Sequence, residues 1–437
     1  MMVLAALGLG IAALIVALRL SRTEQGGTPG ATLAATRPER RRGMPMAAAL
    51  VILWAALNFH PVTENARAAA AWPVPIASGL AAILLWLALS PRGVALSRAD
   101  RALHRLAFAA PGLQKTLAQV ESRRYAARID PDAALRPVLV TSLARAGGSV
   151  LLDALAGQPE FASPAHRHMP FALSPLLWGN LTRGLRGEGR MERMPGDGRL
   201  VFPDSPAALE EMAWIAFWKD HYAADHIRPW TDRPHPEFEA FLRRYMANVV
   251  AAKPGASRYV ARNDASVARL PWIARAWPDA TVVIPLRDPF AHARSLLRQH
   301  RHITDLQTRE PFARRYMHAI GQFGFGSAFR PLGGPRKGDP ATPEFWLSYW
   351  ADTYRMVLET AGPNAILVDQ DALCSDPRRH LIPLAEALAL GNPAELLASA
   401  PRFRPPRGVP PPESAPAALI ACVHDIHAAL KARCLRP

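Results

Sequence analysis

Cysteine is scarce in this chain of 437 residues. The three cysteines, Cys374, Cys422 and Cys434, are far apart and form no CxxC or Cys/His pattern. This spacing argues against a disulfide framework and a structural zinc site, and it suits a reducing compartment. The chain also lacks a zinc finger, a helix-turn-helix and a basic arm with interleaved aromatic residues. We therefore predict no metal and no nucleic-acid partner.

Lysine is rare as well, since only five of the 52 basic residues are lysines. Arginine accounts for most of the formal net charge of +16. A positive excess of this size is compatible with an anionic partner. Because alanine, proline and glycine are also abundant, a compositional bias of the whole chain is the favoured interpretation.

Charged residues are absent from three apolar stretches in the first ninety residues, Met1–Leu18, Met44–Phe59 and Trp72–Leu89. A helix needs about 20 apolar residues to span a bilayer. We predict a membrane region over 1–90, with spans near 1–20, 44–60 and 72–90, of which the second is short. The first stretch lacks the positive n-region of a cleaved signal peptide. The alternative is that the second or third stretch is a buried helix of a soluble domain.

Arginine is distributed unevenly between these stretches. Six arginines lie between the first two, and only Arg67 lies between the second and third. Because arginine collects on the cytoplasmic side of membrane proteins, this pattern predicts a multi-pass protein of the inner membrane. Everything after Leu89 is then cytoplasmic.

From Arg136 onward, short runs of Val and Ile alternate with helix-like segments. The predicted strands are Val138–Thr141, Tyr259–Ala261, Thr281–Leu286 and Ala365–Val368. The predicted helices are Ser149–Leu155, Ala207–His221, Pro236–Ala252, Asp264–Ala276, Phe290–His300 and Pro343–Glu359. This alternation is typical of an α/β fold with a doubly wound parallel sheet, which we place at 136–400. Ligand-binding loops should follow the carboxyl ends of its strands.

Two further segments flank this domain. Residues 91–135 are basic and helix-like, which indicates a connector or a helix on the membrane surface. Residues 401–416 contain seven prolines and are expected to be extended. A final helix over Ala417–Arg433 completes a tail that spans 401–437.

The first candidate site is the loop Ser142–Ser149, which reads SLARAGGS. Between a strand and a helix, its backbone N–H groups suit an anion. Arg145 precedes the glycines and the loop has no lysine, so the GxxxxGK[ST] pattern of a P-loop kinase is absent. Gly147 and Gly148 permit close backbone approach to a ligand, and Ser149 can donate to an oxyanion. A plain strand–turn–helix without a ligand is the alternative.

The second candidate site is Ile284–His300, which reads IPLRDPFAHARSLLRQH. Arg287 ends a predicted strand, and Asp288 can cap the next helix with Pro289 in its first turn. Ser295 follows about two turns into that helix. A guanidinium and a hydroxyl at the carboxyl end of a strand suit a phosphate. A plain helix cap with a solvated arginine is the alternative.

Together, these stretches resemble the sulfotransferase family. ARAGGSVLL resembles its 5′-phosphosulfate loop, often PRSGTTLL in bacterial members, and LRDPFAHARSLLRQH resembles its 3′-phosphate element. Tyr259–Ala280 and Phe345–Arg355 are similar to further family segments, so the resemblance covers roughly Pro137–Leu390. It implies a P-loop-like sulfotransferase architecture, 3′-phosphoadenosine 5′-phosphosulfate (PAPS) as donor, and no metal. The donor-binding residues it implies are Arg145, Ala146, Gly147, Gly148, Ser149, Arg287 and Ser295.

The chain departs from the family pattern at two places. Ala146 and Gly148 stand where hydroxyl residues are usual, so two donors to the sulfonate are lost. The Arg/Lys-Gly-x-x-Gly segment that eukaryotic members use for the 3′-phosphate is absent, and its place is either empty or taken by Arg402, Arg404 or Arg407.

The resemblance also indicates a catalytic base. RHMP, within Ser163–Pro175, is similar to the family's THLP, whose histidine is the base, and histidine transfers protons near neutral pH. We predict that His168 is the base, with His166 as the alternative and a surface histidine pair as the plain interpretation. Arg145 is the predicted catalytic cation, because with Ser149 it can stabilise charge on the bridging oxygen. Arg262 and Asn263 are weaker candidates near the sulfonate.

The predicted function is transfer of a sulfuryl group from PAPS to a hydroxyl or amine. The acceptor is a small molecule, a glycan or a lipid, and we expect Phe171–Pro236 and Gly321–Gly338 to shape its pocket. A catalytically inactive, membrane-associated binding protein is the second hypothesis, since the loop lacks two hydroxyls. A P-loop kinase is the third, which the missing lysine disfavours.

Overall fold

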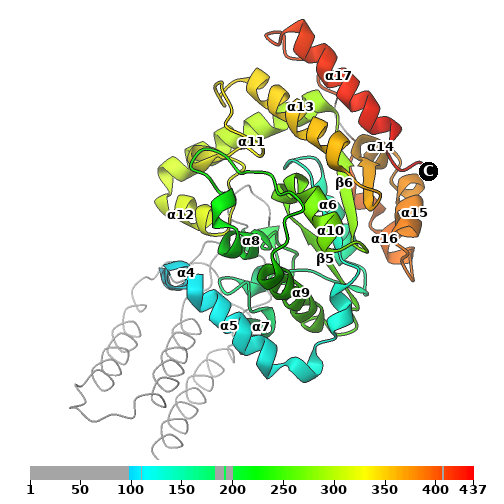
Figure 1. Cartoon of the computed structure of the whole chain (residues 1–437). Helices are drawn as coiled ribbons and strands as arrows, with labels where there is room; N and C mark the ends of the chain where they lie inside the picture. The colour runs from blue at the N-terminus through cyan, green and yellow to red at the C-terminus, as the bar shows by residue number, and fades with distance from the viewer. Residues whose placement is uncertain (1–97, 110, 183–190, 193–199, 406–407) are drawn as a thin grey trace, which may run out of the picture. The chain divides into compact units, whose positions relative to one another are not determined.

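The computed structural model describes residues 98–437, except 110, 183–190, 193–199 and 406–407 (Figure 1). The three predicted membrane spans lie outside these residues. Among the helices that are described, none is both long and apolar enough to cross a membrane. The described residues from His104 onward form one compact unit.

The centre of this unit is a five-stranded sheet in the order β2-β5-β1-β6-β7. Its strands are β1 (Val138–Val140), β2 (Phe161–Ala162), β5 (Arg258–Arg262), β6 (Thr281–Leu286) and β7 (Ala365–Asp369). Every neighbouring pair is parallel. After β1 the chain goes first to β2 and β5 on one side and then to β6 and β7 on the other. The sheet is therefore doubly wound about β1, which confirms the predicted doubly wound parallel sheet.

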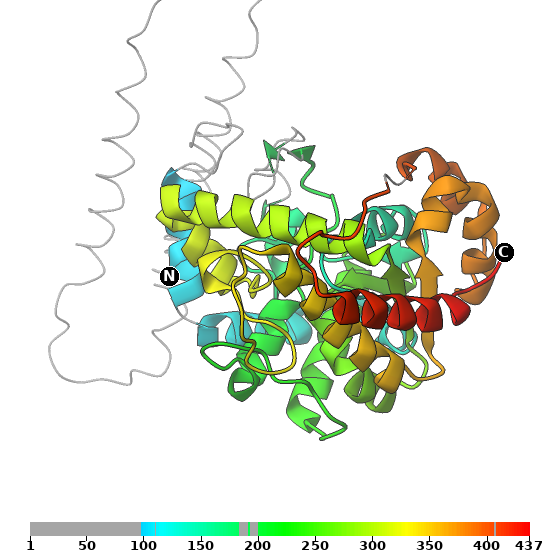
Figure 2. The same ribbon diagram turned by 90° about the horizontal axis from the view of Figure 1, so that it is seen from above.

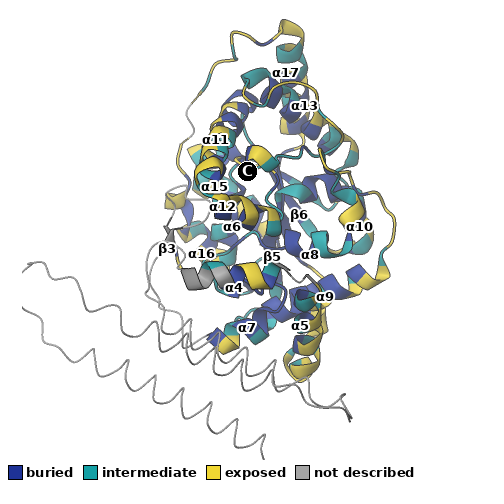
Figure 3. Cartoon of the chain, turned by 90° about the vertical axis from the view of Figure 1, so that its left-hand side faces the viewer, coloured by how far each residue is buried: buried dark blue, intermediate teal, exposed yellow. Residues whose placement is uncertain are grey.

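Both faces of the sheet are covered by helices, as strands without apolar–polar alternation require. One face forms a core with α6 (Gly148–Ala156), α14 (Gln370–Ser375), α15 (Pro377–Ala387) and α16 (Ala394–Ala398). On the opposite face, α9 (Pro236–Ala251) places the ring of Tyr245 6.4 Å from that of Tyr259 in β5. Figure 3 shows the resulting buried strands and inward helix faces.

The remaining helices are α7 (Pro175–Thr182), α8 (Glu211–Phe217), α10 (Leu270–Ala276), α11 (Pro289–Arg309), α12 (Pro311–Ala319), α13 (Pro343–Thr360) and α17 (Ala417–Ala432). Of these, α7 and α12 were not predicted, α8 is shorter than the predicted Ala207–His221, and α11 continues beyond the predicted end at His300. The α17 helix confirms the predicted final helix and lies along α13 in both views (Figures 1 and 2). At the start of α11, the Asp288 carboxylate accepts a hydrogen bond from Ala291 N at 2.8 Å, which confirms the predicted cap.

Two helices lie within the predicted connector, α4 (Arg98–Ala109) and α5 (Pro111–Arg124). The α5 helix packs against α7 and α9. Its Glu121 is fully buried there and accepts hydrogen bonds from Leu177 N and Asn248 Nδ2, both at 2.6 Å. A short antiparallel hairpin, β3 (Met191–Glu192) with β4 (Leu200–Val201), has no counterpart in the predictions.

Candidate active site

The loop between β1 and α6 lies at the point where the sheet reverses its winding direction. Gly147 caps α6 with φ 101°, a left-handed conformation that favours glycine. A Cβ atom at this position would lie 2.4 Å from Cδ of Gln370. Both the backbone and the close approach of Gln370 therefore require glycine at 147.

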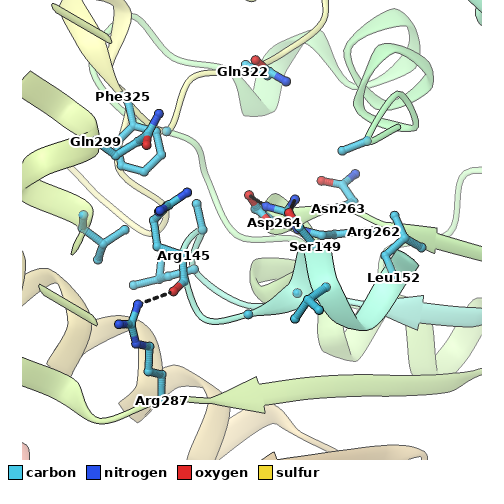
Figure 4. Close-up of a pocket in the computed structure, with 18 of the residues that line it drawn as sticks. Arg145, Ser149, Leu152, Arg262, Asn263, Asp264, Arg287, Gln299, Gln322 and Phe325 are labelled. Carbon is cyan, nitrogen blue, oxygen red and sulfur yellow. Dashed lines mark hydrogen bonds and ion pairs between the residues drawn. The ribbon is translucent and has the colours of Figure 1, made fainter. Parts of the chain in front are cut away.

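Arg145 connects this loop to the second candidate site. Its backbone is left-handed at φ 75°, and its Nε donates to Oγ of Ser295 in α11 at 3.2 Å. A guanidinium nitrogen of Arg287 donates in turn to the carbonyl oxygen of Arg145 at 3.0 Å (Figure 4). The two candidate sites of the sequence therefore meet at one loop. The residues of this contact, Arg145 and Arg287, are 142 positions apart.

His292, in α11, also holds this loop and was not among the predicted residues. It is fully buried, and its Nε2 lies 2.8 Å from the carbonyl oxygen of Ala144. Burial, with the nearby charges of Arg287 and Arg145, lowers the pKa of His292 to about 3. The ring is therefore neutral at pH 7 and donates to the carbonyl from Nε2. The sequence offered one signal for His292, because this residue lies between the predicted site residues Arg287 and Ser295.

Ser149, in the first turn of α6, has an arginine partner. Its Oγ accepts a hydrogen bond from Arg262 at 2.7 Å, and Asp264 holds the same guanidinium through two bonds of 2.9 and 2.6 Å. Gly148 leaves room for this arginine, because a Cβ atom there would lie 3.2 Å from its Cδ and Nε. Arg262 thus brings a cation to the side of the loop where Gly148 lacks a hydroxyl.

A buried polar network supports the end of β5. Asn263 donates to Glu211 at 2.8 Å, and Arg269 donates to both carboxylate oxygens of Glu211 at 2.8 Å. The Arg269 guanidinium lies 4.0 and 4.1 Å from the ring centroids of Trp214 and Trp230. This ion pair holds the Asn263 amide, and the pairing explains how a full charge can be buried here.

A cavity of about 980 Å³, which we call the main cavity, opens over the loop. The arginines in its lining are Arg145, Arg262, Arg287, Arg294, Arg298, Arg330, Arg402 and Arg404. The acidic residues in its lining are Asp153, Glu211, Asp264 and Asp371. Because Asp264 and Glu211 are paired with arginines, the wall keeps an excess of positive charge, which suits an anionic ligand.

The lining of the main cavity also contains amide and aromatic side chains. Gln299, Gln322 and Phe325 lie across the cavity from Ser149 and Arg262 (Figure 4). Trp346, Tyr349 and Phe323 also line it. Residues from both segments that were expected to shape the acceptor pocket contribute to this lining, including Leu209, Ile227, Gly321 and Leu332.

Some predicted donor-site residues are close to the loop without lining the cavity. Ala146 is fully buried, and Ser295 is 2% exposed with its hydroxyl bonded to Arg145. Of the arginines considered for the missing C-terminal segment, Arg402 and Arg404 line the main cavity. Arg407 lies outside the described residues.

The two histidines after β2 are placed differently from each other. His168 is 4% exposed, and its Nδ1 accepts a hydrogen bond from Ala165 N at 3.1 Å. It is not among the residues that line the main cavity, whereas His166 is. The structure therefore favours His166, the sequence alternative, as the histidine with access to a bound ligand.

Within the part of the chain that the structure describes, no group of three or more His, Cys, Asp or Glu side chains is arranged to hold a metal ion.

Comparisons with known proteins give a partial likeness. No family model matches the chain, and no curated protein matches it. A sulfotransferase structure from Mycobacterium tuberculosis is similar at 13% identity and TM-score 0.41, over 91% of this chain and 100% of that one. A sulfotransferase from Mycobacterium avium is similar at 12% identity and TM-score 0.40, over 90% and 97%. One from Alicyclobacillus acidocaldarius is similar at 15% identity and TM-score 0.35, over 69% and 97%. Because these scores are low, the function proposed below rests on the residues of this chain.

Proposed function

We propose that this chain is a sulfotransferase that moves a sulfuryl group from PAPS to a hydroxyl or amine acceptor. The observation that carries this proposal is the contact between the two anion-binding elements. Arg145 in the first and Arg287 and Ser295 in the second are joined by hydrogen bonds at the carboxyl end of the sheet. A donor with separate 5′-phosphosulfate and 3′-phosphate groups needs two such elements beside one cavity.

Each element has a distinct part in this scheme. Backbone N–H groups of the loop at the α6 N-terminus receive the 5′-phosphosulfate, where the helix dipole favours negative charge. Arg287, which lines the main cavity, receives the 3′-phosphate and thereby fixes the position of the donor, while the buried Ser295 supports it through Arg145. Arg145 and Arg262 lie beside the loop and stabilise the charge that grows on the phosphate as it leaves.

His166 is the base that we propose for this reaction. A histidine can take the acceptor's proton near neutral pH, and this one lines the main cavity. The bond between the acceptor oxygen or nitrogen and sulfur forms while the bond from sulfur to the bridging phosphate oxygen breaks. The proton goes to His166, and the 3′,5′-bisphosphate leaves with the electron pair of the broken bond.

Membrane attachment is part of the proposal. The three apolar stretches in residues 1–90 and the arginine distribution around them support an anchor in the inner membrane, with the catalytic domain in the cytoplasm. The acceptor class stays open among small molecules, glycans and lipids. The main cavity's mixed wall of arginines and aromatic rings is compatible with each.

Calorimetric titration of the full chain in neutral detergent with 3′-phosphoadenosine 5′-phosphate tests the proposal. Arg287→Ala should weaken binding by about 10- to 100-fold, because a hydrogen bond to a charged group contributes ~1.5–3 kcal/mol. Arg378→Ala, an exposed arginine of α15, is the matched control and should bind like wild type. Absence of binding to the wild-type chain would overturn the proposal.

Transfer activity separates this enzyme from an inactive binding protein. One observation supports the hypothesis of an inactive binding protein. The hydroxyls of Ser149 and Ser295 already accept hydrogen bonds from arginines. Radiolabelled sulfate transfer from PAPS to a panel of phenols, glycans and lipids distinguishes the two. Binding without transfer to any acceptor favours the inactive protein.

A further inference from the structure

A second cavity, of about 780 Å³, lies between the end of α4, helix α12 and the segment that follows it. Its lining contains Arg105, Arg314, Arg315, Arg330 and His318, which we call the arginine cleft. The rest of its lining is apolar, aromatic or small, and none of the acidic residues that the structure describes contributes to it. Arg105, Arg314 and Arg315 are exposed, so their charges face solvent.

The arginine cleft concentrates positive charge. Among the described residues, none of its four arginines takes part in an ion pair. Burial, together with the positive charges of Arg330 and Arg314, lowers the pKa of His318. Like charges gathered in this way are unfavourable unless an anion neutralises them.

The wall of the cleft is fixed by ring packing between α4 and α12. The ring of Phe108 lies 6.1 Å from that of Tyr316, and the ring of His104 lies 5.4 Å from Tyr316 and 6.4 Å from Phe312. Figures 1 and 2 both show α4 beside α12. The arginines are therefore presented from elements that are already packed together, which lowers the entropic cost of binding.

We propose that the arginine cleft binds the phosphate of an anionic lipid headgroup. Guanidinium groups pair with phosphate through several hydrogen bonds at once, so the ligand class follows from the lining. A lipid source is favoured because Arg105 follows the apolar stretch Trp72–Leu89 after a short segment, and because its neighbour Leu106 is 48% exposed. Basic residues close to a membrane span are drawn to anionic lipids.

The cleft also adjoins the main cavity. Arg330 and Tyr316 line both cavities. The Arg330 guanidinium lies 4.5 Å from the ring centroid of Phe323, which also lines the main cavity. A headgroup in the cleft therefore places that part of the main cavity next to the lipid surface.

Binding of short-chain phosphatidylglycerol to the full chain in neutral detergent tests this proposal. Short-chain phosphatidylcholine and glycerol phosphate are the comparison ligands. The double variant Arg314→Gln/Arg315→Gln should weaken phosphatidylglycerol binding by about 10-fold or more, since each arginine near the headgroup contributes to the attraction. Arg378→Gln/Arg379→Gln removes an equivalent exposed pair from the first turn of α15 and should bind like wild type.

Three results would overturn the inference. Equal affinity for phosphatidylglycerol and phosphatidylcholine removes the anion preference, and equal binding by the double variant removes the site. Glycerol phosphate that binds as tightly as phosphatidylglycerol makes the ligand a soluble phosphate rather than a lipid. The same samples are also titrated with 3′-phosphoadenosine 5′-phosphate. This titration tests the proposed function independently of the lipid site.

Discussion

The Arg287 guanidinium donates to the carbonyl oxygen of Arg145 at 3.0 Å, across 142 residues of sequence. This single bond ties the end of β6 to the loop that follows β1. It also holds Arg145 in its left-handed conformation, from which the side chain reaches Ser295. A phosphate bound at one element is therefore expected to affect the position of the other.

The first prediction concerns Gly147. Gly147→Ala should lower the free energy of unfolding by about 1–3 kcal/mol, because a left-handed backbone disfavours a side chain, and the new Cβ would also collide with Gln370. Urea unfolding measures the change. Gly255→Ala, also at positive φ but with open space around it, should show the conformational cost alone. If both variants lose the same stability, the contact with Gln370 has no effect.

The second prediction concerns Arg262. Arg262→Ala should weaken binding of 3′-phosphoadenosine 5′-phosphate about 10-fold or more, since the loop loses its charged neighbour and Ser149 loses its donor. Gly148→Ala should have a much smaller effect, because the flexible Arg262 side chain can move away from a Cβ 3.2 Å distant. Calorimetry measures both. Comparable losses in the two variants would mean that space in the loop, rather than charge, determines affinity.

Much of this fold could be predicted from the sequence, because the signals for its longer strands and helices lie in neighbouring residues. The strand Thr281–Leu286 has the predicted bounds because a run of apolar residues ends at Arg287 and the Asp288 cap. Two-residue strands such as Phe161–Ala162 carry no such signal, since they depend on pairing with β5. The hairpin Met191–Glu192 with Leu200–Val201 was missed for the same reason.

The site was predictable only in part. Arg145, Ser149 and Arg287 belong to contiguous motifs, and all three line the main cavity. Glu211 belongs to no such motif, and its importance comes from buried contacts with distant residues. His292 lies within the second motif, but only the structure shows that its ring is buried against the carbonyl oxygen of Ala144. The choice between His166 and His168 depends on which side of a single 3-10 turn faces the cavity, and spacing does not determine that.

The third prediction addresses these two histidines. His166→Ala should reduce sulfuryl transfer about 100-fold or more while binding of 3′-phosphoadenosine 5′-phosphate is retained, as expected for loss of a general base. His168→Ala should mainly lower stability, because it removes a buried ring whose Nδ1 accepts from Ala165 N. Transfer rates and urea unfolding are compared for both variants. Loss of transfer only in His168→Ala, with unchanged stability, would restore His168 as the base.

The fourth prediction concerns pH and stability. Burial raises the pKa of Glu121 to about 7, although Leu177 N and Asn248 Nδ2 donate to its carboxylate. A raised carboxyl pKa means that the folded state binds more protons than the unfolded state. The contribution of Glu121 to stability is therefore complete below about pH 4.5 and is lost as the pH rises through 7.

Glu121→Gln mimics the protonated carboxyl. The amide of the glutamine can donate to Oδ1 of Asn248, a buried oxygen that has no hydrogen-bond partner among the described residues. At pH 8.5 the variant should be more stable than wild type by up to about 3 kcal/mol, the equivalent of the pKa shift, and near pH 5 the two should be similar. Urea unfolding at both pH values measures this difference, and Glu386→Gln on the exposed side of α15 controls for loss of a surface carboxylate. If Glu121→Gln is instead less stable than wild type by the same amount at both pH values, the two donors stabilise an ionised carboxylate and burial does not dominate.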